Sequence, residues 1–362
     1  MNKEAYLNEL KNALRHLSLQ EQQAALSFCE EMLADRMEAG MTEEEAVAAM
    51  ESPALMAEKL ALDIKQPPRD AQSNPAVNQT QTDAENPNQW QKMQLKCAAA
   101  QLNHIDLQAG NLPIKIQLSK DDQVTLTYFT RPRNVYEARQ EGDTLLLREI
   151  RTENSRSFFN FFFNFDLGTL PRPEITLEVP ADLMANLKAA TKNGAIALSG
   201  PQMLMHVELS TTNGGLALQN TKCISLDAHT TNGGVAASLV ECRTALSLRT
   251  TNGGVAVSDC HSQAALTLST TNGGVTVTNC TARDEMRVSS TNGGLKVQGL
   301  DAGALHLRTS NSSISGTVQG PQSQWQIESF TTNGKNSLPA FQQGAKPFSA
   351  HTTNSPIRIT FS

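Results

Sequence analysis

Few side chains in this sequence are arranged for catalysis. Asp227 and His229 are the clearest pair, because residues two apart on a β-strand project from the same face. Such a pair is either a catalytic dyad or two exposed side chains without a catalytic role. The sequence lacks the G-x-S-x-G, P-loop, G-x-G-x-x-G and H-E-x-x-H motifs that would indicate catalysis. A polysaccharide-cleaving protein would also need several carboxylates on one face, whereas the positions expected to be exposed are mostly Ser, Thr, Ala and Gln. We therefore expect no enzymatic activity and no cofactor.

The cysteines are the other residues that could do chemistry, as metal ligands or redox groups. They include no C-x-x-C pair, and none is accompanied by histidines at the spacing of a zinc site. Two of them lie ten residues after a repeated asparagine and two lie eight residues after one, which is the phase expected for a corner of the repeat described below. We predict reduced structural thiols and no metal, at Cys29, Cys97, Cys223, Cys242, Cys260 and Cys280.

A five-residue motif, Thr-Thr-Asn-Gly-Gly, recurs through the second half of the chain. Its asparagines are spaced 20, 19, 20, 20, 20, 19, 22 and 21 residues apart, which marks a repeat architecture. In one unit Leu246 and Leu248 precede the motif and Val255 and Val257 follow it, alternating with small or polar residues. Two short strands therefore flank one turn. The repeated asparagines are Asn193, Asn213, Asn232, Asn252, Asn272, Asn292, Asn311, Asn333 and Asn354.

The repeat predicts a mainly β fold, a two-sheet β-solenoid of about nine 20-residue rungs. Asn-Gly-Gly contains residues that tolerate a positive φ, so we expect it at a sharp corner. Because every rung places its asparagine at the same point, the side-chain amides can stack as a ladder. The ladder is either turn chemistry that keeps the rungs in register or an exposed strip that binds carbohydrate or peptide. It lacks the aspartates of calcium-binding repeats, and the atypical units at Asn193 and Asn354 are expected to cap the two ends.

A dense aromatic cluster precedes the repeat. Residues 157–165 contain six of the twelve phenylalanines of the protein. An exposed apolar patch of this density is typical of a surface that contacts a membrane or a partner, and the alternative is a hairpin folded onto the open end of the solenoid. The candidate patch consists of Phe158, Phe159, Phe161, Phe162, Phe163 and Phe165.

Four regions follow from these patterns. Residues 1–66 are expected to form a small all-α module, and residues 67–89 a flexible polar linker that lacks large apolar side chains. Residues 90–185 are expected to form a β-rich cap region that leads into the repeat at 186–362.

Helix start signals are frequent in the first region. Ser18 with Glu21 and Thr42 with Glu45 have the spacing of capping boxes, and Ser52 precedes a proline at a first helical position. Helices are expected near residues 3–17, 19–39, 43–50 and 53–65.

The charge of the chain is concentrated in the helical module. Residues 1–66 carry six Lys or Arg against thirteen Asp or Glu, a net charge of −7, which leaves +1 of the total −6 for residues 67–362. An acidic surface repels phosphate, so we expect no nucleic-acid partner. We also read no signal peptide and no membrane span, and we expect the protein in the cytoplasm, with peripheral membrane association left open.

Two resemblances add to this interpretation. The Thr-Thr-Asn-Gly-Gly units, the Phe-rich segment and Ile-Thr-Leu-Glu-Val-Pro at 175–180 resemble a bacterial β-strand-repeat family of unknown function whose members are commonly labelled candidate adhesins. Residues 1–66, with Tyr-Leu-Asn-Glu-Leu at 6–10 and Glu-Ser-Pro at 51–53, resemble the HAAS-type helical signalling domain. The second resemblance implies a link to envelope sensing, commonly with a membrane span between the two parts, where this chain has only a polar linker.

The hypothesis that follows is a non-enzymatic interaction scaffold in bacterial envelope-stress or membrane-associated signalling. Residues 1–66 would contact a protein partner, and the solenoid would present a rigid face. The alternative is a surface or exported adhesin that binds glycan or protein through the solenoid. The sequence leaves the oligomeric state open.

Overall fold

The computed structural model describes residues 3–15, 22, 26, 29, 33, 42–50, 52–57, 90–131, 135–150 and 173–362. The predicted linker and the Phe-rich segment lie outside these residues. The chain divides into two compact units. One comprises residues 1–89, 131–133 and 152–170 and contains the helices, and the other, the β unit, comprises residues 90–130, 134–151 and 171–362. Each is described by itself.

The helical unit contains α1 (Lys3–Ala13) and α3 (Glu43–Ala48), and residues 53–57 are also helical. Its core includes the buried side chains of Tyr6, Leu10, Leu14, Cys29 and Leu33. These residues recur at helical spacing, so one face of each segment is apolar and buries itself against the others.

Helix α1 ends at Ala13, short of the predicted residue 17. The N–H of Arg15 bonds to the carbonyl of Asn12, only three residues back, which tightens the last turn and ends the regular helix. The predicted capping box at α3 is confirmed, since Thr42 Oγ1 accepts from the Glu45 N–H at 3.3 Å and Glu45 Oε2 accepts from the Thr42 N–H at 2.9 Å.

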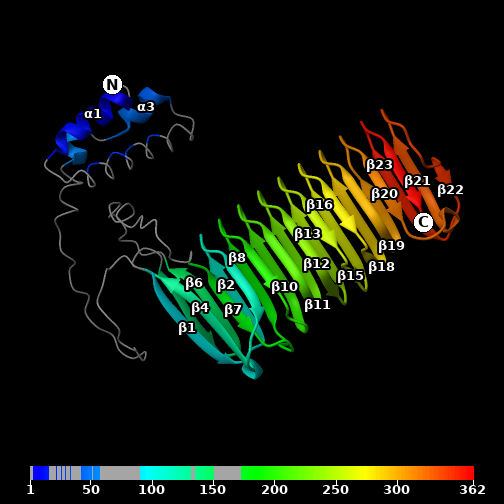
Figure 1. The fold of residues 1–362 in the computed structure, drawn as a ribbon, viewed down its shortest axis with the longest axis horizontal. Coiled ribbons are helices and arrows are strands. Elements are labelled where there is room, and N and C mark those ends of the chain that lie inside the picture. Colours follow the sequence, from blue (N-terminus) through cyan, green and yellow to red (C-terminus); the bar gives the residue numbers. More distant parts are fainter. Residues whose placement is uncertain are drawn as a thin grey trace. The chain divides into compact units, whose positions relative to one another are not determined.

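The β unit is a solenoid, as predicted from the repeat (Figure 1). In a regular rung a strand of about six residues leads into the Thr-Thr-Asn-Gly-Gly corner, a four-residue strand follows, and a second corner returns the chain to the next rung. Neighbouring rungs pair in parallel and in register, for example Leu246 with Leu266 and Val255 with Val275. Period-two alternation sends one side chain of every two into a continuous core that no single rung could form.

The strands of the repeat carry the following bounds. They are β8 (Asn186–Thr191), β9 (Ile196–Ser199), β10 (Leu204–Thr211), β11 (Leu216–Thr230), β12 (Val235–Cys242), β13 (Ala245–Thr250), β14 (Val255–Ser258), β15 (His261–Ser262), β16 (Ala265–Thr270), β17 (Val275–Thr278), β18 (Thr281–Ser290), β19 (Leu295–Arg308), β20 (Ile314–Val318), β21 (Trp325–Thr331), β22 (Phe341–Gln342), β23 (Lys346–Thr352) and β24 (Ile357–Phe361). A 3₁₀ turn, Gln322–Gln324, precedes β21.

The region predicted as a cap contributes rungs of its own. Strand β2 pairs in parallel with β8 on one side and β6 on the other, and β3 lies in the same way between β9 and β7. Antiparallel strands then cover the outer edges of β6 and β7. Strand β5 pairs with β6, β4 pairs with β7, and β1 pairs with β4, so the edges of the last parallel strands are hydrogen-bonded. The strands are β1 (Gln91–Ala98), β2 (His104–Ala109), β3 (Ile114–Leu118), β4 (Gln123–Thr130), β5 (Val135–Glu141), β6 (Thr144–Ile150) and β7 (Ile175–Val179), with a 3₁₀ turn at Ala99–Gln101.

The chain also doubles back at the opposite end. Strand β23 pairs with β19 on one side and β21 on the other, so the last rung in the sequence is inserted before the preceding one. The expectation that the unit at Asn354 forms the terminal rung is therefore wrong, and the rung of β21 is outermost. The short strand β22 pairs antiparallel with β21 and covers part of its exposed edge.

Candidate interaction surface

The repeated asparagines form one continuous ladder of side-chain hydrogen bonds. Each Nδ2 donates to the Oδ1 of the asparagine on the neighbouring rung, at distances from 2.5 to 2.9 Å. Asn111, which the sequence pattern did not single out, begins the ladder by accepting from Asn193, so the unit at Asn193 does not cap this end as expected. In spatial order the ladder runs through Asn111, Asn193, Asn213, Asn232, Asn252, Asn272, Asn292, Asn311, Asn354 and Asn333. The side-chain amides therefore bond to one another and link neighbouring rungs.

The two glycines of each motif differ in what they permit. A Cβ on Gly253 would overlap the carbonyl of Gly233 on the preceding rung, whereas a Cβ on Gly254 would lie 3.3 Å from the Gly274 oxygen. The motif lies at a corner of the rung, as expected, but neither glycine has a positive φ, so tolerance of that conformation is not the reason for the glycines. The first glycine is required because the backbones of successive rungs approach too closely for a side chain. The hydroxyl of Thr250 secures the same corner by donating to the Gly233 oxygen at 2.7 Å and accepting from the Gly253 N–H at 3.2 Å.

Positive φ values occur instead at the second corner of the rung. Asn220, Leu239, Asp259 and Asn279 have φ between 47° and 54°, each seven residues after its ladder asparagine. Asn and Asp tolerate this conformation better than other non-glycine residues. Leu239 is the exception, and its side chain is 54% exposed.

The four repeat cysteines are buried in the core behind that corner. Cys223 and Cys242 pair in register with their Sγ atoms 3.4 Å apart, and the Cys260 thiol donates to the Ser258 carbonyl at 3.3 Å. The contact with Cys223 and burial together raise the pKa of Cys242, so the thiol stays protonated. All six cysteines of the chain are free thiols.

One constellation has the composition of a hydrolase triad. Ser349 Oγ lies 2.8 Å from His306 Nδ1, and His306 Nε2 lies 3.0 Å from Glu285 Oε1. The same cross-rung contact from a histidine Nδ1 occurs between His206 and Ser225 at 2.7 Å, and again at His261. Because the contact repeats, we interpret it as a cross-strand side-chain pair that stabilises neighbouring rungs, with a carboxylate added at one rung.

The two residues singled out for catalysis lie side by side without forming a dyad. Asp227 and His229 are both exposed on β11, and no hydrogen bond or ion pair joins them. Asp227 pairs in register with Glu208 and Ser247, and His229 with Ser210 and Arg249. Within the part of the chain that the structure describes, no group of three His, Cys, Asp or Glu side chains could hold a metal ion.

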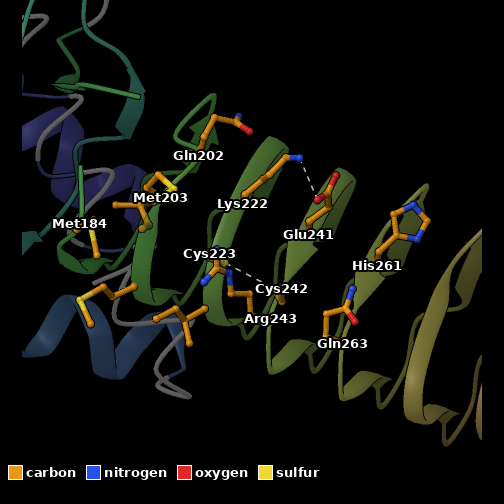
Figure 2. A pocket seen from close by; sticks show the side chains of 13 residues that line it. Met184, Gln202, Met203, Lys222, Cys223, Glu241, Cys242, Arg243, His261 and Gln263 are labelled. Carbon is orange, nitrogen blue, oxygen red and sulfur yellow. Dashed lines mark hydrogen bonds and ion pairs between the residues drawn. The ribbon is translucent and has the colours of Figure 1, made fainter. Parts of the chain in front are cut away.

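A groove crosses the outside of successive rungs next to the buried cysteines (Figure 2). Its cavity volume is about 670 Å³. One end is apolar, with Met184 59% exposed and Met203 41% exposed, and Met205 and Ile224 beside them. The polar or charged side chains that line it are Gln202, Lys222, Glu241, Arg243, His261 and Gln263, and the buried Leu204, Cys223 and Cys242 complete the lining.

Of the charged side chains in the groove, two form an ion pair and one has no partner in the part of the chain that the structure describes. Lys222 Nζ and Glu241 Oε2 form an ion pair at 3.0 Å, whereas the Arg243 guanidinium has no hydrogen-bond or ion-pair partner among the described residues. Sequence reasoning did not find this groove, because its residues come from separate rungs. The available signal was the uninterrupted apolar run 203–205, which breaks the alternation of the neighbouring strands.

The Phe-rich patch predicted at residues 158–165 lies outside the described residues. In the sequence it falls between β6 and β7. No helix within the described residues is long and apolar enough to cross a membrane.

Family models match both units of the chain. Residues 5–59 match the HAAS family, and no curated protein matches the chain. A candidate adhesin from Bacteroides fragilis is 14% identical, with 76% of this chain and 99% of that chain covered and a TM-score of 0.40. A candidate cell adhesion protein from Clostridium sporogenes is 9% identical, with 76% and 100% covered and a TM-score of 0.20. Both likenesses are too low to inform function.

The family model for the β unit covers most of the chain. It matches residues 102–360, which includes the solenoid rungs on both sides of the Phe-rich segment and the inserted rung at the far end. The chain belongs to the Toastrack DUF4097 family.

Proposed function

We propose that this protein is a non-enzymatic interaction scaffold whose solenoid binds a protein partner on a rigid surface. The main support is the groove beside Met184 and Met203, in which exposed apolar side chains lie next to polar and charged ones. Exposed apolar patches of this kind mark interaction sites, and methionine adapts well to different partners. The histidine and serine side chains that could serve catalysis are engaged in contacts between rungs.

The finer part of the proposal concerns the pathway. The match of residues 5–59 to the HAAS family supports a role of the helical unit as a docking module in envelope-stress or membrane-associated signalling. Helices as short as α1 and α3 need packing partners, which favours docking. We place the protein in the cytoplasm, where its thiols would stay reduced, with the Phe-rich patch as a peripheral membrane contact.

The test is affinity capture from gently lysed native cells. The full chain is compared with a chain that lacks residues 1–66, in the soluble and the membrane fractions. A specific partner that is lost with residues 1–66 supports the docking role. If the protein is found outside intact cells, or if neither form retains a specific partner, the signalling scaffold is refuted and the adhesin alternative gains ground.

A further inference from the structure

We propose that the groove between Met184 and Gln263 binds a peptide segment in the polyproline-II conformation, in which a large apolar residue precedes an acidic residue by three positions. The inference deepens the proposed function, since it rests on the solenoid being a binding surface and names the class of its ligand. It follows from the order of side chains along the groove, from the spacing of the rungs and from one unpaired charge.

The apolar end of the groove is a seat for one large side chain. Met203 and Met205 come from one rung, Met184 lies beside them, and Ile224 comes from the next rung. Figure 2 shows Met184 and Met203 together at one end of the groove, with Lys222, Glu241 and His261 following on successive rungs. A leucine or phenylalanine placed on these methionines would remove apolar surface from water on both partners.

The charged end of the groove is a seat for a carboxylate. The Lys222 and Glu241 side chains neutralise each other at 3.0 Å, and both are about half exposed. The Arg243 guanidinium remains without a partner among the described residues, and its planar fork matches a carboxylate. The net charge of the groove is therefore positive, which complements an acidic ligand.

The distance between the two seats sets the spacing in the ligand. Leu204 pairs in register with Cys223, and Cys223 with Cys242, so the methionines and Arg243 lie two rungs apart. Two spacings of about 4.8 Å give about 9.6 Å. In the polyproline-II conformation three residues rise about 9.3 Å and complete one turn, so side chains three positions apart lie on the same face. An apolar side chain on the methionines thus places the side chain three residues later beside Arg243.

A peptide fits the groove better than a lipid does. The apolar seat is confined to one end, and from Lys222 onward every rung contributes a polar or charged side chain, so an acyl chain would cross charged groups. Gln202 uses its Nε2 on the carbonyls of Gly200 and Asn220, which leaves its Oε1 to accept from a ligand N–H. Gln263 lies at the other end, and both amides suit a peptide backbone.

The test uses the purified full chain and fluorescein-labelled, capped hexapeptides in a polarisation assay. The probe is Gly-Leu-Ala-Ser-Glu-Gly, its partner has Gln in place of Glu, and a third peptide of the same composition is Gly-Leu-Glu-Ala-Ser-Gly. We expect saturable binding of the probe and at least about tenfold weaker binding of the other two, because a charge-assisted hydrogen bond is lost. In Arg243→Gln the Glu and Gln peptides should bind equally, and in Met203→Ser both should bind more weakly.

Arg249→Gln is the matched control. Arg249 is an exposed arginine on β13 that lies outside the groove and bonds to Ser247, so its replacement should leave all three affinities unchanged. The proposal is overturned if no peptide binds below about 1 mM, if the Glu and Gln peptides bind wild-type protein equally, or if laurate binds and the peptides do not. Such a failure leaves the proposed scaffold intact when the chain that lacks residues 1–66 still captures a specific partner, so the two failures can be told apart.

Discussion

Replacement of the first glycine of a repeat motif should be far more damaging than replacement of the second. Gly253 and Gly254 are adjacent in the sequence, and both lie at the same corner of one rung. An alanine Cβ at 253 would overlap the carbonyl carbon and oxygen of Gly233, which are backbone atoms that cannot rotate away. An alanine Cβ at 254 would lie 3.3 Å from the Gly274 oxygen, a distance that a small shift relieves.

The magnitude follows from what must move. To accept the methyl group at 253, the two rungs must separate locally, which lengthens the bond from the Asn252 N–H to the Thr231 oxygen, now 2.8 Å, and the bond from Thr250 Oγ1 to Gly233. Overpacking typically costs about 1–3 kcal/mol, and each weakened bond about 0.5–1.5 kcal/mol, so Gly253→Ala should destabilise the protein by about 3 kcal/mol or more. Gly254→Ala should stay within about 1 kcal/mol of wild type, because alanine also restricts the unfolded chain.

The assay is urea unfolding of the full chain followed by far-ultraviolet circular dichroism. Repeat arrays need not unfold in one step, so the midpoints of the β signal are compared rather than extrapolated free energies. The same pair of substitutions at 233 and 234 and at 273 and 274 provides internal replication, since the contacts repeat there. Equal midpoints for the first and second glycine would refute the close-approach explanation of the motif.

Four further outcomes are expected. Asn252→Ala removes two ladder hydrogen bonds and should lower the free energy of unfolding by about 1–3 kcal/mol. Asn333→Ala, at the end of the ladder, removes one bond and should lower it by about half as much. Equal losses of stability in urea unfolding would contradict a stabilising role of the ladder. Leu239→Asn relieves a left-handed leucine and should stabilise by about 1 kcal/mol, seen as a rise of about 2 °C or more in the thermal midpoint, and a fall would count against the strain. Burial raises the pKa of the Cys29 thiol from 9.0 to about 12. The stability that this thiol contributes is therefore complete below pH 9 and is lost as the pH rises towards 12. In Cys29→Ala the stability of the helical unit, followed by circular dichroism, should depend less on pH in this range. Replacement of the phenylalanines at 161–163 with serine should release the protein from sedimenting vesicles, and unchanged partitioning of a folded variant would remove the membrane contact from the proposal.

The helical unit shows how far local signals reach. Thr42 and Glu45 were recognisable as a capping box from their spacing alone, because both hydrogen bonds are made within four residues. The end of α1 was not, since its last turn tightens through a bond from Arg15 to Asn12 that competes with continuation of the helix.

The groove could not be predicted from the sequence for a different reason. Met203 and Arg243 are 40 residues apart, and they face the same groove only because two rungs of the solenoid separate them in space. The alternation of apolar and polar residues assigns side chains to the inside or the outside of a strand, but it does not say which outward side chains meet at a bend.

The sequence by itself determined the solenoid and the asparagine ladder, because a repeat of about 20 residues with two alternating strands allows each rung to bury its apolar face only against its neighbours. Only the tertiary structure decided the order of the rungs at both ends, where β2 lies between β6 and β8 and β23 lies between β19 and β21. Strands with similar alternating patterns can pair with several partners, so the choice among them depends on which pairing leaves the outer edges covered. The structure also decided the role of the first glycine, since the distance between stacked backbones is a property of two rungs and is absent from either one alone.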